Sequence, residues 1–274
     1  MPVDLRIEDG VGIITLNRPE RLNALSDDMH GALDIAFTAA FRAREARVII
    51  LTGAGRGFCA GADLSRLSRF AASRGADFDL PRPGIVPPVF QGLDAPAELL
   101  TTYTFPLAMP KPVIAAVRGP CVGVGFVLAA CCDIRFAAKT GVFSAAFPQR
   151  GLIAEAGLAW LLPRLVGHNF AADILLSGRR VEAEEAQKMG LVSRVVEDDE
   201  LLPAALDYAK TMAASASPRA MQRIKRQLWE GAAQNFGEAA KAAYDMLRED
   251  LASEDYAEGV ASFLEKRPAR FNPL

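Results

Sequence analysis

Two glycine-rich segments are the parts of the sequence whose residue types and spacing most directly suggest chemistry. One runs over residues 53–64 and the other over residues 119–126, and each follows a run of apolar residues. Neither has the Gly-Lys-Ser/Thr ending of a phosphate-binding loop, and the second lacks the third glycine of a dinucleotide-binding turn. Such turns present backbone N–H groups beyond the end of a strand, and two N–H groups aimed at one point stabilise an oxyanion. For either turn alone, the need for a tight bend explains the glycines equally well.

Other reactive side chains are few. Cys59 and Cys121 lie in the two turns, but no histidine accompanies them, so a thiolate nucleophile is not expected. The four cysteines form no C-x-x-C pair, which favours a reduced, cytoplasmic setting. We expect His30 at the surface or at an interface, and His168, which follows Gly167, at the C-terminal cap of a helix. Because there are only two histidines, a multi-histidine metal site is excluded and no metal is expected.

The elements that must position the turns alternate between strand and helix. Runs rich in β-branched residues predict buried strands, and Ser26 is a suitable N-cap for a helix with one apolar face. The succession of strand, glycine-rich turn and helix occurs twice, so we expect an α/β fold. The predicted strands lie at 3–7, 11–16, 48–52, 112–117 and 133–137, and a buried helix is expected at 122–130.

Two further regions have a different character. Residues 65–110 contain five prolines between Pro81 and Pro96, which predicts an irregular excursion that forms a wall over a site. From Ala156 onward the pattern is helical, and Pro163 is expected to divide the first helical segment. The later helices are predicted at about 219–230, 236–250 and 253–265, the first of them starting at Ser217-Pro218.

The composition is that of a globular protein. The 274 residues include 31 basic and 33 acidic side chains, for a net charge of −2. With a pI near 5.8, no basic surface for nucleic acid or for an anionic membrane is expected. The uncharged run between Arg118 and Asp133 is too short to span a bilayer, and the charged N-terminus is unlike a signal peptide. We therefore expect a cytoplasmic protein with no nucleic-acid or membrane partner.

The turns and several other segments together resemble the enoyl-CoA hydratase/isomerase (crotonase) family. The similarity covers essentially the whole chain, with residues 65–110 matching least. An ordered set of matches is much more specific than any one of them. The matching segments are Asn17-Arg18-Pro19, Leu22-Asn23-Ala24-Leu25, Phe58-Cys59-Ala60-Gly61-Ala62-Asp63-Leu64, Gly123-Val124-Gly125, Cys132-Asp133-Ile134 and Phe263-Leu264-Glu265-Lys266-Arg267.

This resemblance implies a fold, an assembly and a ligand. The fold is a crotonase-like spiral of ββα units over residues 1–200, followed by a helical trimerisation region over residues 201–274. The assembly is a homotrimer or a dimer of trimers. The ligand is an acyl-CoA thioester, as in fatty acid metabolism, with coenzyme A as part of the substrate and no separate cofactor.

The resemblance also assigns roles to individual residues. The oxyanion hole consists of the backbone N–H groups of Ala62 and Val124, and most relatives have glycine at the second position. Phe263 and Lys266 match positions that reach the coenzyme A of a neighbouring subunit, although simple helix packing explains Phe263 nearly as well. The other positions implied to bind the substrate or its coenzyme A are Leu22, Ala24, Ala60, Gly61, Asp63, Leu64 and Gly123.

The sequence departs from the family at the acid/base groups. The two glutamates that activate water in hydratases fall on Val127 and Phe147, neither of which can transfer a proton; Phe147 is instead expected to line the acyl pocket. Glu155, eight residues beyond Phe147, stands where dienoyl-CoA isomerases and some other members carry an aspartate. In apolar surroundings its pKa should be raised, which suits a general base. Alternatively, Glu155 merely caps the following helix.

Three functions remain open from the sequence. The first is an enzyme that stabilises a thioester enolate and moves a double bond, with Glu155 as the single acid and base. The second is a hydratase or a C–C lyase that uses Glu155 with a polar group from residues 90–105, where Asp94, Glu98 and Tyr103 are candidates. The third is a non-catalytic acyl-CoA-binding protein that lost both glutamates.

Overall fold

A six-stranded β-sheet is the centre of the molecule in the computed structural model, which describes residues 1–76 and 86–274. Its order is β1-β2-β3-β4-β6-β9; β1 and β2 are antiparallel and the other neighbours are parallel. Strands buried on both faces favour β-branched residues, as in the Val-Ile-Ile run of β3. The strands are β1 (Val3–Glu8), β2 (Val11–Leu16), β3 (Val48–Gly53), β4 (Val113–Val117), β6 (Ile134–Ala138) and β9 (Arg194–Val196).

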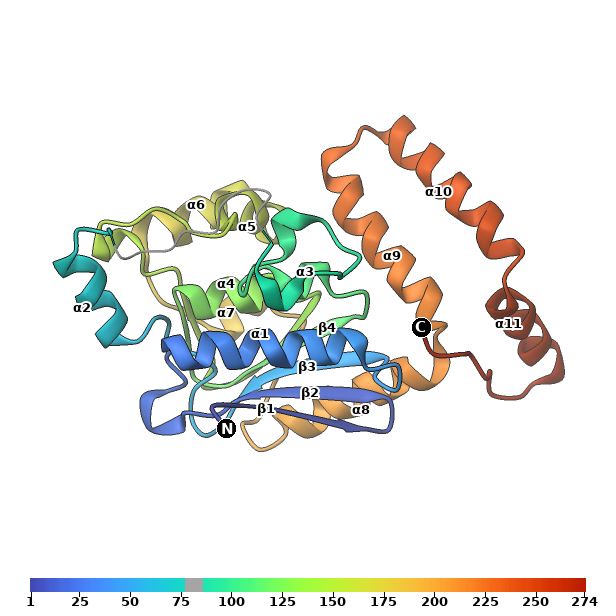
Figure 1. Ribbon diagram of the computed structural model, residues 1–274, viewed down its shortest axis with the longest axis horizontal. Coiled ribbons are helices and arrows are strands. Elements are labelled where there is room, and N and C mark those ends of the chain that lie inside the picture. The colour runs from blue at the N-terminus through green and yellow to red at the C-terminus, as the bar shows by residue number, and fades with distance from the viewer. Residues whose placement is uncertain (77–85) are drawn as a thin grey trace.

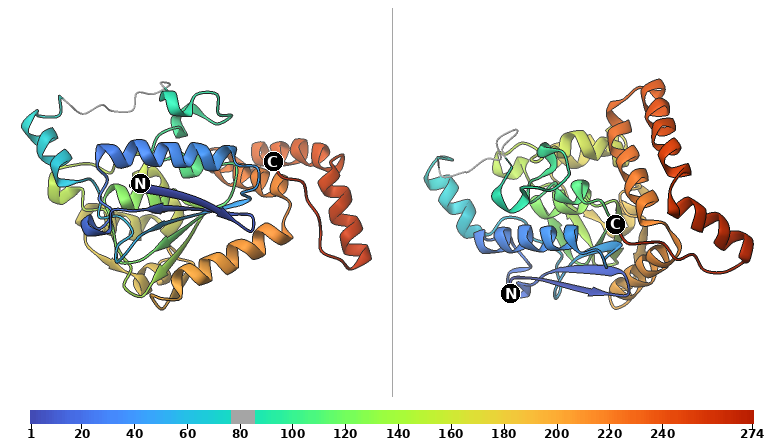
Figure 2. Two further views of the ribbon diagram at one scale, coloured as in Figure 1. Left: turned by 60° about the horizontal axis from the view of Figure 1, so that its bottom comes forward. Right: turned by 45° about the vertical axis from the view of Figure 1, so that its right-hand side comes forward.

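Helices cover both faces of this sheet (Figures 1 and 2). α1 (Asp27–Arg42) lies on one face, and the Ser26 hydroxyl accepts a hydrogen bond from the Met29 N–H, as the predicted N-cap requires. α8 (Leu201–Ser215) lies on the other face, where its alanines and Leu201 pack on alternate residues of the strands. The mixed α/β fold with a helical C-terminal region is therefore confirmed.

A second sheet of three short strands extends from the second glycine-rich turn. Its order is β5-β7-β8, with β5 (Pro120–Val122), β7 (Val142–Ser144) and β8 (Val181–Glu182). Pro120 thus begins a strand, whereas the sequence interpretation treated the whole segment 119–126, which includes Pro120, as a turn. β5 leads through Gly123 directly into α4 (Val124–Ala130), all of whose residues are buried.

The remaining helices follow the prediction except around Pro163. This proline lies inside α5, and the helix continues past it to its C-cap at Gly167. The positive φ of Gly167, +79°, ends the helix. His168 is consequently the first residue of α6 and does not cap the preceding helix. These helices are α5 (Leu158–Val166), α6 (His168–Ser177), α7 (Ala183–Lys188), α9 (Pro218–Glu230), α10 (Phe236–Leu251) and α11 (Glu254–Glu265).

The segment 65–110 is less irregular than predicted. α2 (Leu64–Ala72) is a regular helix, and α3 (Phe105–Ala108) follows single helical turns at Pro88–Phe90 and Ala97–Leu99. Pro81 and Pro83, on which part of the prediction rested, lie outside the described residues. Phe105 stacks between Phe37 of α1 and Phe90, with ring centroids 5.2 and 4.7 Å away. This aromatic stack fixes residues 86–108 over α1.

The last three helices form an arm that extends away from the sheet (Figure 1, orange to red). The arm exposes many large apolar side chains, whereas α8 buries its apolar face against the sheet. Trimerisation through residues 201–274 stays a prediction. The exposed side chains of the arm include Leu228, Phe236, Tyr244, Phe263 and Leu264.

One buried ammonium group joins the arm to the core. Lys225 of α9, with only 5% of its side chain exposed, forms an ion pair with Asp133 at 2.7 Å. Its Nζ also donates to the carbonyl oxygens of Pro106 at 2.7 Å and Lys111 at 3.0 Å. The Asp133 carboxylate also accepts a hydrogen bond from the Val113 N–H at 2.7 Å. All donors of this ammonium group therefore have acceptors from three different segments.

Replacing Lys225 with alanine is expected to lower the free energy of unfolding by about 3 kcal/mol or more. Removing one partner of a buried pair leaves the other charge uncompensated, and the acceptors of the lost ammonium group are left without a donor. Urea denaturation followed by circular dichroism measures the effect. The matched control is Lys241→Ala, because Lys241 pairs with Asp245 on an exposed helix surface and should leave the midpoint unchanged. Equal midpoints for both variants would contradict the role of Lys225.

Candidate functional site

The first glycine-rich turn is held in shape by Asn23. This side chain is fully buried, and its amide donates to the carbonyl oxygens of Ala54 at 3.0 Å and Gly57 at 2.7 Å. Its Oδ1 accepts from the Arg18 N–H at 2.8 Å. Buried polar groups with all partners in place specify one local conformation. The segment that follows, residues 58–63, therefore starts from a fixed position.

The extended residues 59–63 lie between Leu25 on one side and β5 on the other. The Leu25 N–H donates to Gly61 O at 2.8 Å, and the Asp63 N–H donates to Leu25 O at 3.0 Å. Toward β5, the Val122 N–H donates to Cys59 O at 2.9 Å. The Gly61 carbonyl and the Ala62 N–H belong to one trans peptide and point in opposite directions, so the Ala62 N–H faces away from Leu25.

The start of α4 packs closely against this segment. A Cβ at Gly125 would lie 2.5 Å from Cys59 O, and one at Gly61, where φ is +100°, would lie 3.0 Å from Val122 O. Only glycine permits these approaches. Val124 is the first residue of α4, so its N–H has no acceptor within the helix.

The two N–H groups that the sequence singled out are both unused. Neither the Ala62 N–H nor the Val124 N–H has a hydrogen-bond acceptor among residues 1–76 and 86–274. They come from segments in direct contact, through Cys59 and Gly125. Both donors are therefore free on two segments that contact each other, and their convergence on one oxyanion stays a prediction.

Most residues that the resemblance assigns to the coenzyme A lie around this turn. The Ala60 N–H donates to Leu22 O at 2.9 Å, and Arg18 donates to Ala24 O at 3.0 Å. Arg18 also pairs with Asp63 at 3.0 Å. Asp63 caps α2 through Ser65, and hydrogen bonds from Ser65, then the Arg18 charge, lower its pKa.

Leu64 and Gly123 are two further residues that the resemblance assigns to the substrate or its coenzyme A. Leu64 begins α2 with 75% of its surface exposed. Gly123 donates its N–H to Ser144 O at 2.9 Å.

The positions of the two missing glutamates are apolar and enclosed. Val127 on α4 is fully buried and Phe147 is 4% exposed. Both belong to the main hydrophobic core, against which Ala62, Ala154 and Ala156 also pack. No carboxylate occupies either position, so neither can hold or activate a water molecule by proton transfer.

Glu155 is half-buried and does not cap a helix. The N-cap of α5 is Gly157, two residues later, and it receives no side-chain hydrogen bond. Within the described ranges, the Glu155 carboxylate forms neither a hydrogen bond nor an ion pair. Burial raises its pKa, and the charge of Arg66 partly opposes this shift. The predicted direction of the pKa is confirmed, and the capping alternative is wrong.

His30 is less exposed than the expected surface position implies, and an interface position for it stays a prediction. It is half-buried on α1, and the Tyr103 hydroxyl lies 3.0 Å from its Nε2. Burial lowers the pKa of His30 to about 4, with a further contribution from Arg66, so the ring is neutral near pH 7. His30 and Asp34 stand one helical turn apart beside the apolar face of α1. This spacing is the feature of the sequence from which a polar site could have been predicted.

The other polar candidates differ in exposure. Asp34 is half-buried; burial raises its pKa to about 6, and its Oδ1 lacks a partner among the described residues. Asp94 and Glu98 are exposed. Of the three candidates from residues 90–105, only Tyr103 lies in a partly buried environment.

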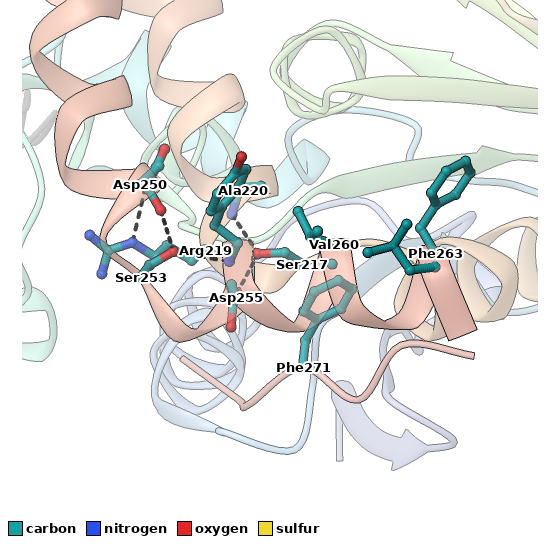
Figure 3. A pocket seen from close by; sticks show the side chains of 12 residues that line it. Ser217, Arg219, Ala220, Asp250, Ser253, Asp255, Val260, Phe263 and Phe271 are labelled. Atoms are coloured by element: carbon teal, nitrogen blue, oxygen red, sulfur yellow. Dashed lines mark hydrogen bonds and ion pairs between the residues drawn. The ribbon is translucent and has the colours of Figure 1, made fainter. Parts of the chain in front are cut away.

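Phe263 and Lys266 are not brought to this site within one chain. Both lie at the end of α11, at the opposite end of the molecule from α2 (Figure 1). Phe263 is 82% exposed and borders a cavity of about 540 Å³ between α9, α11 and Phe271 (Figure 3). None of Ala62, Val124 and Glu155 lines that cavity.

The cysteines and potential metal ligands offer no alternative chemistry in the part of the chain that the structure describes. All four cysteines are buried and free, and burial raises the pKa of Cys59 to about 12. No group of three or more His, Cys, Asp or Glu side chains is placed there to hold a metal ion. Among the same residues, no helix is long and apolar enough to cross a membrane.

Comparison with known proteins gives long, continuous matches. The 1,2-epoxyphenylacetyl-CoA isomerase of Escherichia coli is 36% identical, over 97% of this chain and 96% of that protein. A Mycobacterium tuberculosis protein named "Probable enoyl-CoA hydratase" is 39% identical, over 94% and 88% of the two chains.

Solved structures and a family description agree with these relatives. The crystal structure of an enoyl-CoA hydratase from Polaromonas superposes with a TM-score of 0.83 at 31% identity, covering 98% of this chain and 99% of that one. An enoyl-CoA hydratase from Bacillus anthracis gives a TM-score of 0.84 at 28% identity, with 99% of each chain covered. Residues 6–80 and 94–273 match the description Enoyl-CoA hydratase/isomerase. The chain belongs to the enoyl-CoA hydratase/isomerase family.

Proposed function

We propose that this protein is an acyl-CoA isomerase that moves a carbon–carbon double bond through a thioester enolate. The Ala62 and Val124 N–H groups bind the thioester oxygen and stabilise the negative charge that develops there. The Glu155 carboxylate removes a proton from a carbon next to the double bond. The same carboxyl group returns this proton to the carbon at the far end of the shifted electron pair. One C–H bond breaks and one forms, so no other reactant is needed.

The observation that carries this proposal is the state of Glu155. It is a partly buried carboxylate without a hydrogen bond or an ion pair in residues 1–76 and 86–274, and burial raises its pKa. A carboxylate in this condition is a stronger base than an exposed one. The similarity to a protein named 1,2-epoxyphenylacetyl-CoA isomerase supports an isomerase among the activities of the family.

Addition of water is less well supported. The positions of both hydratase glutamates are occupied by Val127 and Phe147, which are enclosed in the core. Hydration would need a second polar group opposite Glu155. We also propose that the chain assembles as a trimer, so that Phe263 and Lys266 reach the coenzyme A of a neighbouring subunit.

The test is an isomerase assay with purified protein. Incubation with 3-hexenoyl-CoA should produce the conjugated 2-enoyl thioester, detected by its absorbance. A parallel incubation with crotonyl-CoA measures hydration as loss of that absorbance. Hydration faster than isomerisation would favour the hydratase. Tight binding of both esters without turnover of either would make the protein a binding protein and would refute the proposal.

The isomerase rate is expected to fall on acidification at a pH that is still above 4.5. Glu155 accepts a proton only when ionised, and burial raises its pKa above that ordinary value. The Arg66 charge opposes the increase, so Arg66→Gln should move the acid limb of kcat to higher pH. The control Arg164→Gln changes an exposed arginine of α5 that stacks on Trp160 and should leave the limb in place. A limb that does not respond to Arg66→Gln would exclude this charge as a determinant.

A further inference from the structure

We propose that Ala156, held in a left-handed turn conformation, positions the Glu155 carboxylate for proton transfer. This inference rests on the proposed isomerase function and adds a positioning residue to it. Ala156 follows Glu155 directly in the chain, and its side chain is a methyl group that exchanges no proton. In this role it acts only through the carboxylate of its neighbour.

The first line of evidence is the shape of the backbone directly after Glu155. The Leu158 N–H donates to Glu155 O at 3.0 Å, which closes a β-turn. Both central residues of this turn have positive φ, +48° at Ala156 and +74° at Gly157. Positive φ at both central positions is characteristic of a type I′ turn. Glu155 is the first residue of the turn, so the conformation of Ala156 sets the direction in which the chain leaves Glu155.

The second line of evidence is that alanine is not a residue that this turn favours. Glycine, asparagine and aspartate are preferred, because a Cβ crowds the neighbouring carbonyl oxygen when φ is positive. Asp9 and Gly10 have the same pair of positive φ values, but they join the antiparallel strands β1 and β2, whose twist calls for such a turn. The turn at 155–158 leads into α5 instead. Strained residues of this kind persist only where the surrounding structure holds them, and they cluster at active sites.

The third line of evidence is how the surrounding structure holds this turn. Ala154 and Ala156 both pack against the main hydrophobic core, and Leu158 is fully buried. The Gly157 carbonyl oxygen accepts from two N–H groups of α5, at 2.9 and 3.0 Å. The backbone on both sides of Glu155 is therefore fixed to the core and to the start of the helix.

The fourth line of evidence is that no other group orients the carboxylate. Among residues 1–76 and 86–274, Glu155 has neither a side-chain hydrogen bond nor an ion pair. The position of its carboxylate consequently depends on the backbone that carries it. A misplacement of about 1 Å can lower a catalysed rate by about 100-fold, so a change in this turn should reach kcat.

The experiment compares Ala156→Thr with Ala156→Asn. The two new side chains are both polar and similar in volume, but the β-branched threonine resists positive φ, whereas asparagine tolerates it. Ala156→Thr should lower kcat with 3-hexenoyl-CoA by about 10- to 100-fold and leave the Kd of butyryl-CoA unchanged. Ala156→Asn should retain most of the turnover, because it keeps the turn. Equal kcat values for the two variants would overturn the inference.

A double substitution tests whether Ala156 acts through Glu155. In the Glu155→Gln protein, adding Ala156→Thr should change the remaining rate by a factor of about 1, because the group that the turn positions no longer takes up a proton. A reduction as large as in the unmodified protein would show that Ala156 supports another part of the site. That result would also overturn the inference.

The matched control is Asp9→Thr. Asp9 also has a φ of +48°, and it precedes the end of β2 that lies opposite to Gly53. Its replacement should therefore leave kcat unaltered, even if it lowers the urea midpoint. If circular dichroism shows that Ala156→Thr does not fold, Ala156→Gly takes its place. Glycine accepts positive φ but adds backbone freedom, so it should lower kcat by about 3-fold or more; an unchanged kcat would overturn the inference.

The outcomes separate this inference from the proposed function. Turnover that falls in Glu155→Gln but not in the Ala156 variants would refute the positioning role and leave the isomerase function intact. Failure of the unmodified protein to isomerise 3-hexenoyl-CoA would refute the isomerase function and, with it, this inference.

Discussion

Replacing Glu155 with glutamine is expected to reduce the isomerase kcat by about 10²- to 10⁴-fold, the usual contribution of a general acid–base group. Glutamine has nearly the same size and removes only the ability to take up a proton. The N–H donors of Ala62 and Val124 remain, so the Kd of a saturated acyl-CoA should be unchanged. Steady-state kinetics with 3-hexenoyl-CoA and calorimetry with butyryl-CoA measure the two quantities.

Glu98→Gln is the control for this substitution. Glu98 is an exposed carboxylate of the segment over α1, and its replacement should leave kcat unaltered. Turnover by Glu155→Gln at the unmodified rate would remove Glu155 from the mechanism. A parallel loss of butyryl-CoA binding would show that the residue supports the fold or the ligand rather than the proton transfer.

The second large effect is expected for Val124→Pro. Proline deletes the N–H of this residue, and it is tolerated at the first position of a helix, where Val124 stands. Loss of one oxyanion donor should lower kcat by about 10²- to 10³-fold. Since the charge on the thioester oxygen develops mainly in the transition state, binding of butyryl-CoA should change much less.

Val124→Ala separates the donor from the side chain. Alanine keeps the N–H and loses only two methyl groups, so it should retain most of the turnover. Circular dichroism establishes that both variants are folded. If the proline and alanine variants are equally active, the Val124 N–H does not act on the substrate.

The elements that the sequence predicted well are those with a strong local signal. The strands at 48–52 and 112–117 carry runs of apolar and β-branched residues, and the structure places β3 and β4 there. Ser26 and Ser217 precede α1 and α9 as N-caps and accept from Met29 and Ala220. Such signals depend on neighbouring residues in the chain, which a single sequence contains.

The errors concern features that depend on tertiary contacts. Pro163 remains inside α5. An interior proline costs free energy of helix formation, and the packing of α5 compensates for this cost. Pro120 became a strand residue because β7 pairs with it. The contact of His30 with Tyr103 joins residues 73 positions apart, and no local pattern specifies such a distance.

The candidate site was therefore predictable only in part. The turn at residues 53–64 and the carboxylate at Glu155 follow from residue type and from the resemblance to a family. The unused state of the Ala62 and Val124 N–H groups required the hydrogen bonds around Leu25 and Cys59. The contact of His30 with Tyr103 and the effect of the Arg66 charge on Glu155 depend on the packing of segments that are remote in the sequence.

The junction at Lys225 has a consequence for the order in which the chain matures. Asp133 and the carbonyl oxygens of Pro106 and Lys111 belong to segments that leave the ribosome long before residue 225 does. Until α9 emerges, the nascent sheet contains a carboxylate and two carbonyl groups whose cation is still missing. Completion of the enzyme during synthesis therefore waits for the last fifth of the chain, which begins with α9.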